Sequence, residues 1–321
     1  MQSTAIAHPN VALIKYWGKQ DIDTNLPAVG SLSLTLEGIS TRTQVSFDSE
    51  FKADALLING AADEIALPRV TRCLDLLREA AGLNLSAQVV STNDFPTGAG
   101  LASSASGYAA LVKAAASALE LDMPAAQLDL IARIGSGSAP RSLHDGIVLL
   151  EKTDDPTGMQ CHSIASPDDW PLSVVVAVTT REKKAISSTG GMESSRTTSP
   201  CYKSWVETHL ADLKTALACV KSRDFDALAR VSEHSCLKMH AVAMSSDPPL
   251  VYWSGATVEC MQRIRELRDS GVPVFFTIDA GPQVKAVCLP QAAKQVHAAL
   301  AELPGVIDVH DCSLGYGARI A

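Results

Sequence analysis

The sequence lacks the features that membrane proteins and nucleic-acid-binding proteins need. No apolar run approaches the roughly 18 residues that a membrane-spanning helix requires. The first residues, Met1-Gln2-Ser3-Thr4, carry no basic stretch and no long apolar stretch, so we expect no signal peptide. Lys and Arg number 27 against 35 Asp and Glu, and the net charge of −8 argues against non-specific binding to nucleic acid or anionic membranes.

The cysteines offer no disulfide framework and no zinc motif. None of the eight forms a C-x-x-C pair, and the sequence shows no internal repeat and no low-complexity tract. We therefore expect reduced, scattered thiols, as in a cytoplasmic protein. The cysteines are Cys73, Cys161, Cys201, Cys219, Cys236, Cys260, Cys288 and Cys312.

What is present indicates a two-domain α+β protein. At roughly 100–200 residues per domain, 321 residues indicate about two domains. With 46% hydrophobic and 19% charged residues, the chain can bury a large core. Strand and helix patterns are mixed without strict alternation, which favours α+β over a doubly wound sheet. Ser, Thr and Gly cluster near residues 180–200, so we place the domains at 1–185 and 186–321.

Hydrophobic periodicity predicts the individual elements. Residues 5–16 read as a strand or strand pair with an irregularity at Pro9-Asn10. The other predicted strands are 32–36, 41–47, 85–91, 146–151, 172–179, 274–279, 284–289 and 306–310. The predicted helices are 68–81, an Ala-rich helix ending at Leu121, 123–134, 202–221, 224–244, 257–270 and 291–303.

A loop of small residues, PTGAGLASSA at 96–105, leads directly into the Ala-rich helix. Unpaired N–H groups and the dipole at a helix start favour phosphate, and glycines let the backbone approach a ligand closely. The hydroxyls of Ser103 and Ser104 could bind phosphate oxygens or a magnesium ion. A capped helix after a flexible turn explains the same composition equally well. The segment contains neither the common P-loop pattern nor the Rossmann pattern.

Four segments, in order along the chain, resemble one known superfamily. Residues 96–105 are similar to the phosphate loop of the GHMP superfamily of small-molecule kinases. Residues 10–19 (NVALIKYWGK), 135–143 (GSGSAPRSL) and 275–282 (FFTIDAGP) are similar to motifs of the mevalonate diphosphate decarboxylases within it. Weaker similarity covers residues 187–192 and 238–241.

The resemblance implies a GHMP two-domain architecture, with a ribosomal-protein-S5-like N-terminal domain that binds nucleotide and a ferredoxin-like C-terminal domain. It also implies ATP- and Mg²⁺-dependent conversion of mevalonate 5-diphosphate to isopentenyl diphosphate, ADP, phosphate and CO₂. Such an enzyme of isoprenoid biosynthesis would be a cytoplasmic homodimer whose partners are small molecules, with no nucleic acid and no membrane. The active site would lie in the cleft between the domains.

Asp279 and Arg141 match the family's catalytic positions. Asp279 follows an apolar run, where a partly shielded carboxylate suits proton acceptance or orientation of a hydroxyl. By itself, an Asp before Gly-Pro is ordinary turn chemistry. Arg141 could grip the substrate carboxylate with two parallel hydrogen bonds, with Ser138 beside it; without the resemblance, a surface arginine explains it as well. Pro140 departs from the small residue of relatives and could stiffen the loop.

Lys15, Tyr16 and Lys19 match the family's diphosphate pocket, with Lys15 also among its catalytic residues. In one extended strand Lys15 and Tyr16 would point to opposite faces, so a turn, which Gly18 could supply, is needed to aim both at one ligand. Solvent-facing lysines beside an aromatic core pair are the alternative.

Further expected contacts come from the resemblance. Ser188 and Met192 match substrate-binding positions, although the stretch could equally be a linker. Cys236 and His240, four residues apart, are more simply explained by helix packing than by a metal site. The residues expected at the nucleotide are Pro96, Gly98, Ala99, Gly100, Leu101, Ala102, Ser103 and Ser104, with Ser103 also expected at the metal.

One departure from the family pattern leaves the identity of the substrate undecided. Relatives typically carry Asn-Ser where this chain has Val29-Gly30, so polar groups are lost there. A phosphomevalonate decarboxylase or a mevalonate 3-kinase is therefore the alternative enzyme. A nucleotide-binding regulatory protein without catalysis is the alternative from another class, and intact Asp279 and Arg141 count against it.

Overall fold

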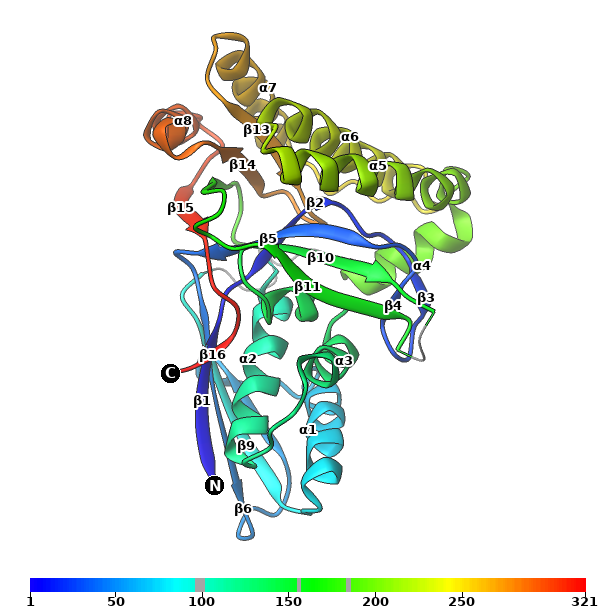
Figure 1. Ribbon diagram of the computed structural model, residues 1–321, viewed down its shortest axis with the longest axis vertical. Coiled ribbons are helices and arrows are strands. Elements are labelled where there is room, and N and C mark those ends of the chain that lie inside the picture. The colour runs from blue at the N-terminus through cyan, green and yellow to red at the C-terminus, as the bar shows by residue number, and fades with distance from the viewer. Residues whose placement is uncertain (96–101, 155–156, 183–185) are drawn as a thin grey trace.

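A computed structural model of the chain describes residues 1–95, 102–154, 157–182 and 186–321. Its elements confirm the α+β prediction (Figure 1). The strands are β1 Gln2–Ala7, β2 Asn10–Ile14, β3 Lys19–Asp21, β4 Leu26–Pro27, β5 Ser31–Glu37, β6 Thr41–Asp48, β7 Ala55–Ile58, β8 Ala61–Ala62, β9 Ser86–Asn93, β10 Ile147–Lys152, β11 Met159–Ala165, β12 Ser173–Val178, β13 Val274–Ile278, β14 Val284–Cys288, β15 Asp308–Leu314 and β16 Arg319–Ile320. The helices are α1 Leu67–Ala81, α2 Ser103–Ala118, α3 Ala125–Gly135, α4 Ser188–Thr198, α5 Tyr202–Ser222, α6 Phe225–Met244, α7 Gly255–Asp269 and α8 Ala293–Ala301, with short 3-10 helices η1 Ala139–Ser142 and η2 Pro290–Ala292.

The lower half of the molecule in Figure 1 is a six-stranded sheet covered by α1 and α2, and α3 packs against these two helices. The strand order is β16-β1-β6-β9-β7-β8, and the pairs are antiparallel except β7 with β9. Along β6 buried and more exposed residues alternate, because only one sheet face packs against the helices. Leu74, Leu77 and Leu111 from the helices meet Val45 and Phe47 from the sheet in one core.

The upper half is built on an eight-stranded sheet that combines strands from both predicted domains. Its path runs β11-β10-β5-β15-β12-β14-β13, and β2 also pairs with β5. Helices α5 and α6 lie side by side over β2 and β13, while α7 and α8 pack on β13 and on β12 and β15 (Figure 1). The strand β12 precedes the expected boundary at 185/186 yet pairs with β14 and β15, and the boundary stays a prediction.

The observed elements differ from the predicted ones mainly where the sequence is short or lacks a clear hydrophobic periodicity. Residues 5–16 form two strands, as one alternative foresaw. The strands β7 and β11 and the helix α4 were not predicted, because their sequences show little periodicity. All eight cysteines are free thiols. No helix in the described part of the chain has the length and apolar character to cross a membrane.

Candidate active site

Asp279 lies directly after β13 and is held by two lysines. Its Oδ1 accepts from Lys15 Nζ at 2.5 Å, and its Oδ2 lies 3.5 Å from Lys285 Nζ. The lysine side chains are 1% and 3% exposed, so both ion pairs are largely shielded from water. Thr277 donates to the Ala12 carbonyl and thereby ties β13 to β2, which fixes where Asp279 emerges.

The charges around Asp279 keep its carboxylate ionised. Burial by itself raises the pKa of Asp279, but Lys15, Lys285 and Arg141 outweigh burial and hold this pKa well below its usual range. An ionised carboxylate accepts hydrogen bonds and cannot donate one. Asp279 can therefore orient a hydroxyl group at any ordinary pH.

Arg141 is also buried, and its guanidinium is positioned by polar side chains from other elements. Its Nε donates to Asn10 Oδ1 at 3.0 Å and its Nη1 donates to Ser31 Oγ at 2.8 Å. The guanidinium also lies 5.7 Å from the centre of the Tyr16 ring. Pro140 sits in the first turn of η1, where its missing N–H costs no hydrogen bond. Arg141 is thus fixed in place before any ligand binds.

Lys15 and Tyr16 face the same cavity because β2 ends at Ile14. The expected turn is present, since Gly18 has a φ of +98°, a conformation that favours glycine. Burial raises the pKa of Tyr16, so this residue stays a neutral phenol. Lys15 and Tyr16 can therefore both face one ligand, which they could not do as neighbours within a single extended strand.

Lys19 projects into the cavity from β3. Its Nζ donates to Asn25 Oδ1 at 2.5 Å and to Thr189 Oγ1 at 3.0 Å. Burial, with a further contribution from the positive charge of Arg69, lowers the pKa of Lys19 to about 8. Lys19 is therefore a cation whose charge is sensitive to mildly alkaline pH.

These residues line one cavity of about 350 Å³, which we call the charged cavity. Among the described residues its lining contains four basic side chains and a single acidic one, so it suits an anionic ligand. Residues from both halves of the molecule contribute. The charged side chains are Lys15, Lys19, Arg69, Arg141 and Asp279, and the other expected residues that line it are Tyr16, Ser138, Ser188, Met192, Ala102, Ser103 and Ser104.

A second cavity of about 300 Å³, which we call the apolar cavity, adjoins the charged one. Ser103, Ser104 and Arg69 line both cavities, so the start of α2 lies where they meet. Most of its wall comes from apolar side chains of the lower sheet and its helices. These are Leu56, Ile58, Ile65, Ala66, Val70, Val89, Tyr108 and Leu111.

The start of α2 is only partly described. The predicted phosphate-loop residues Pro96, Gly98, Ala99, Gly100 and Leu101 lie outside the described residues. Within the described part, Ser104 Oγ lies 3.3 Å from Ser136 Oγ, which lies 3.2 Å from Ser138 Oγ. This chain of hydroxyls connects the α2 N-terminus to the loop that carries Arg141.

The stretch around Ser188 and Met192 is a helix, α4, so the linker alternative was wrong. Ser187 caps it by accepting from the Gly190 N–H at 3.1 Å. Met192 packs in an apolar cluster with Trp17, and the cluster also contains Val29. The helix therefore presents its first turn to the charged cavity while its buried face anchors it.

Val29 and Gly30, the departures from the family pattern, line neither cavity. Val29 packs in the same apolar cluster as Met192. A Cβ at Gly30 would lie 2.8 Å from the Leu150 carbonyl oxygen and 2.9 Å from Leu213 Cδ2, so a serine has no room there. In this chain the two residues therefore contribute to packing rather than to the described lining of either cavity.

Possible metal ligands outside the cavities are better explained by packing. Asp129, His144 and Cys161 bring their ligand atoms within 4.8 Å of one another. However, His144 Nε2 lies 2.9 Å from both Asp129 oxygens, and burial raises the pKa of Cys161 well above its usual value. The raised pKa disfavours the thiolate that a metal would bind. We therefore interpret the cluster as a hydrogen bond from His144 to Asp129 of α3, with Cys161 of β11 packed beside it.

The sequence did not identify Lys285, Arg69, Asn10 or Ser31 as parts of the site. A lysine within the apolar segment 284–289 was the one available signal, because buried lysines are rare unless paired. Arg69, Asn10 and Ser31 hold or flank charged groups through contacts between distant segments, and a local sequence pattern does not predict such contacts.

The two halves and the cation-lined cavity formed by both define an enzyme of the two-domain GHMP type. Residues 7–165 match the diphosphomevalonate decarboxylase-like N-terminal domain, and residues 174–313 match the mevalonate 5-diphosphate decarboxylase C-terminal domain. The chain belongs to the diphosphomevalonate decarboxylase family.

Comparisons with individual relatives support this family assignment. The diphosphomevalonate decarboxylase of Candida albicans is 35% identical over 300 residues, which cover 88% of this chain and 83% of the relative. The solved mevalonate diphosphate decarboxylase of Staphylococcus aureus is 35% identical with a TM-score of 0.93, covering 100% of this chain and 98% of that one. A structure of MDDEF in complex with MVAPP, AMPPCP and magnesium is 34% identical with a TM-score of 0.92, covering 100% and 99%.

Proposed function

We propose that the chain catalyses the ATP- and Mg²⁺-dependent decarboxylation of mevalonate 5-diphosphate to isopentenyl diphosphate, with ADP, phosphate and CO₂ as the other products. The observation that carries the proposal is a half-buried carboxylate between two buried lysines in a cavity lined by cations. Family membership and the complex of a relative with MVAPP, AMPPCP and magnesium support it.

The charged cavity would hold the diphosphate substrate. Lys15, Tyr16, Lys19, Ser138 and Ser188 line it, as the resemblance implied. A fixed guanidinium recognises a carboxylate with little loss of entropy on binding, which suits Arg141 for the substrate's carboxylate. Lys19 and the first turn of α4 lie together through the Lys19–Thr189 hydrogen bond, which suits them for the diphosphate.

The nucleotide would lie across both cavities. The apolar cavity suits a planar base, and Ser103 and Ser104 at the junction suit its phosphates. The Ser103 hydroxyl is an oxygen ligand of the kind that Mg²⁺ accepts beside phosphates. When bound, the ion would offset the negative charge of those phosphates.

Asp279 would orient the tertiary hydroxyl of the substrate toward the transferable phosphoryl group. Phosphoryl transfer depends mainly on positioning and charge stabilisation, so an oriented hydroxyl matters more than a strong base. The low pKa of Asp279 fits an acceptor that is ionised before the substrate arrives. Loss of the new phosphate and of CO₂ then forms the carbon–carbon double bond.

Product analysis tests the proposal. Purified protein with ATP, Mg²⁺ and mevalonate 5-diphosphate should release CO₂, phosphate and isopentenyl diphosphate in equal amounts. Good turnover of the 5-monophosphate without turnover of the diphosphate would reject the substrate, and phosphorylation without CO₂ would indicate a 3-kinase. No ATP turnover with any of these substrates would favour a regulatory protein.

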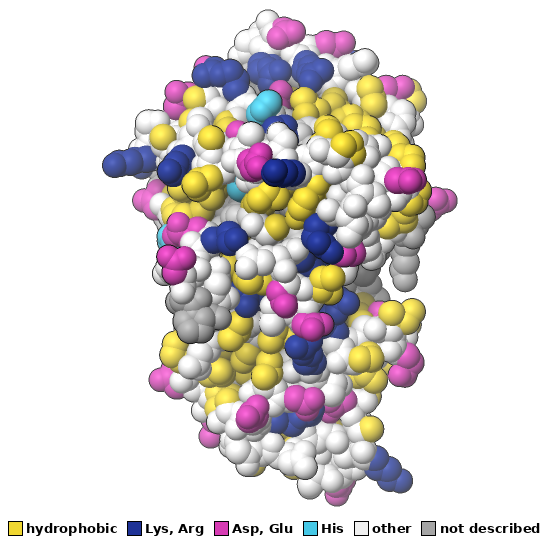
Figure 2. Space-filling view, turned by 90° about the vertical axis from the view of Figure 1, so that its right-hand side faces the viewer, with side chains coloured by type: hydrophobic (Ala, Val, Ile, Leu, Met, Phe, Trp, Pro, Cys, Tyr) yellow, Lys and Arg dark blue, Asp and Glu magenta, His cyan; other side chains and the backbone are white. Residues whose placement is uncertain are grey.

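The cytoplasmic location and homodimeric state also belong to the proposal, on the strength of the resemblance and of the scattered free cysteines. Light scattering coupled to gel filtration tests the dimer, and fractionation of the source cells tests the location. On the face seen in Figure 2 acidic and basic side chains intermix.

A further inference from the structure

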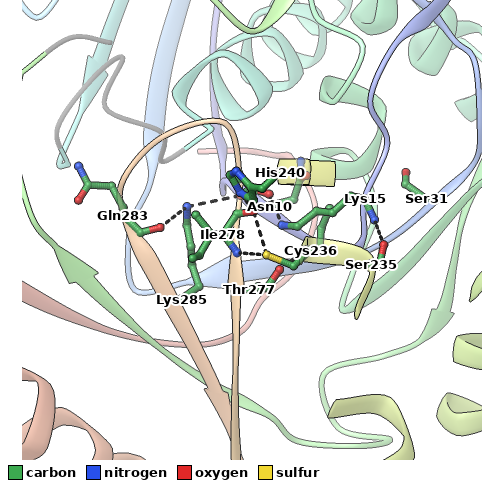
Figure 3. Close-up of polar contacts among 12 residues, drawn as sticks. Asn10, Lys15, Ser31, Ser235, Cys236, His240, Thr277, Ile278, Gln283 and Lys285 are labelled. Carbon is green, nitrogen blue, oxygen red and sulfur yellow. Dashed lines mark hydrogen bonds and ion pairs between the residues drawn. The ribbon is translucent and has the colours of Figure 1, made fainter. Parts of the chain in front are cut away.

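Lys285 has no assigned role in the proposed reaction, although it contacts Asp279. It lies on β14, opposite Thr277 of β13, and its side chain is 3% exposed. Its Nζ lies 3.5 Å from Asp279 Oδ2 and 3.4 Å from the Gln283 carbonyl oxygen, to which it donates. Figure 3 shows Lys285 on its strand beside the strand of Ile278, with its amine directed along the hairpin.

Lys285 differs from Lys15 in its relation to the charged cavity. Lys15 and Asp279 line this cavity, whereas Lys285 is not among the described residues that line it. The amine of Lys285 therefore contacts one oxygen of Asp279 from outside the described lining of the charged cavity, while Lys15 contacts the other oxygen. A carboxylate gripped at both oxygens has little freedom to rotate about its Cβ–Cγ bond.

The groups that face Asp279 from α6 do not replace this lysine. His240 and Cys236 contact the carbonyl of Ile278, the residue before Asp279. Burial lowers the pKa of His240 to about 3 and raises the pKa of Cys236, so both are neutral near pH 7. Among the described residues, the charged and titratable groups facing Asp279 are Lys15, Lys285, Arg141, His240 and Cys236.

We propose that Lys285 is a positioning residue of the reaction: from outside the charged cavity it fixes the Asp279 carboxylate in one orientation and keeps it ionised. This inference rests on the proposed function for its kinetic effect. Its effect on Asp279 itself requires no substrate, since the ion pair exists in the free protein.

The kinetic test is Lys285→Met, which removes the charge and keeps an unbranched side chain. We expect kcat to fall about 10- to 100-fold, as when a catalytic group loses its orientation, while KM for ATP and for the diphosphate changes less than about threefold. The acid limb of the kcat–pH profile should move to higher pH, because Asp279 loses a neighbouring cation and protonates more readily. Lys285→Arg should restore part of kcat and of the acid limb.

The matched control is Lys294→Met, which removes an exposed lysine on α8 and should leave all three quantities unchanged. Unchanged kcat in Lys285→Met would overturn the proposal. A large rise in KM with unchanged kcat would make Lys285 a substrate ligand instead. A fall in kcat with an unmoved acid limb would reduce it to a structural role. If Lys285→Met does not fold, Lys285→Gln carries the same test.

A second measurement separates this proposal from the proposed function. In the ligand-free protein, the infrared band of the protonated carboxyl, assigned with Asp279→Asn, should appear at higher pH in Lys285→Met than in the wild type. An identical titration in both proteins would reject Lys285 even if the enzyme is active. A shifted titration in a protein that does not decarboxylate mevalonate 5-diphosphate would reject the function alone.

Discussion

The two adjoining cavities differ in the physical interactions that they offer to a ligand. The charged cavity offers ionic groups that are already fixed: the buried Arg141 is held by Asn10 and Ser31, and the half-buried Asp279 is held by Lys15 and Lys285. The apolar cavity offers mainly aliphatic surface between a sheet and its helices. A fixed buried charge is costly to lose, whereas a single apolar contact contributes little. We therefore expect substitutions to have much larger effects in the first cavity than in the second.

The largest effect is expected from Asp279→Asn. The substitution keeps the shape and removes the charge, so turnover should fall about 10²- to 10⁴-fold, the range typical of positioned acid–base groups. Binding of ATP, measured by calorimetry without the second substrate, should stay close to the wild type, since the apolar cavity is intact. Retained turnover would show that the reactive hydroxyl is oriented by another group.

Arg141→Lys should have the next largest effect. A lysine cannot reproduce the fork that bonds Asn10 and Ser31 while facing a carboxylate. Each hydrogen bond to a charged group contributes about 1.5–3 kcal/mol, so kcat/KM for the diphosphate should fall about 10- to 100-fold. Steady-state kinetics measures this. A matching loss of ATP binding to the free enzyme would mean that Arg141 serves the nucleotide instead.

Lys19 gives the charged cavity a pH dependence that the apolar one lacks. Since its pKa is lowered to about 8, its charge is present below that pH and is lost as the pH rises above it. KM for the anionic diphosphate should therefore rise several-fold between about pH 7 and about pH 9.5. Lys19→Met should have a high KM at both values, and the exposed-lysine control Lys52→Met should follow the wild type. A pH-independent KM in the wild type would contradict this role.

The sequence predicted the residues that line the charged cavity, and the long helices, better than the contacts that hold these residues in place. Asp279, Arg141, Lys15, Lys19 and Ser138 were placed by motif, and all line the charged cavity. Long periodic helices such as α5 and α6 were predicted to within one or two residues of their observed ends. In both cases a pattern of neighbouring residues carries the information.

The supporting contacts were beyond sequence reasoning, because they join segments far apart in the chain. Lys15 meets Asp279 across 264 residues, and Arg141 meets Asn10 across 131. Helix α4 also escaped prediction, since its Ser-, Thr- and Gly-rich sequence is a poor helix former. Its buried Met192 packs against residues of other elements, which is a tertiary effect that local propensity does not contain.

A modest effect is expected in the apolar cavity from Ile65→Ser. Ile65 lines the cavity yet is 95% exposed, so its replacement should leave the fold intact. If a base covers this side chain, its loss costs up to about 1.5 kcal/mol, and KM for ATP should rise at most about tenfold. KM for the diphosphate should not change. Ile307→Ser, at a 53% exposed isoleucine outside both cavities, is the control and should leave both constants unchanged.

The smallest effect is expected from Pro140→Ser, which restores a small residue beside Arg141. The proline fits the first turn of η1, and the guanidinium of Arg141 is held by Asn10 and Ser31 whatever residue precedes it. Activity should stay within about twofold. Urea unfolding should show a stability loss of at least about 0.4–1 kcal/mol, because serine gives the unfolded chain more freedom and because the ring of the buried Pro140 is lost. A tenfold fall in kcat would show instead that the stiff turn itself positions Arg141. The side-chain hydrogen bonds to Asn10 and Ser31 would then not be sufficient to hold the Arg141 guanidinium in place.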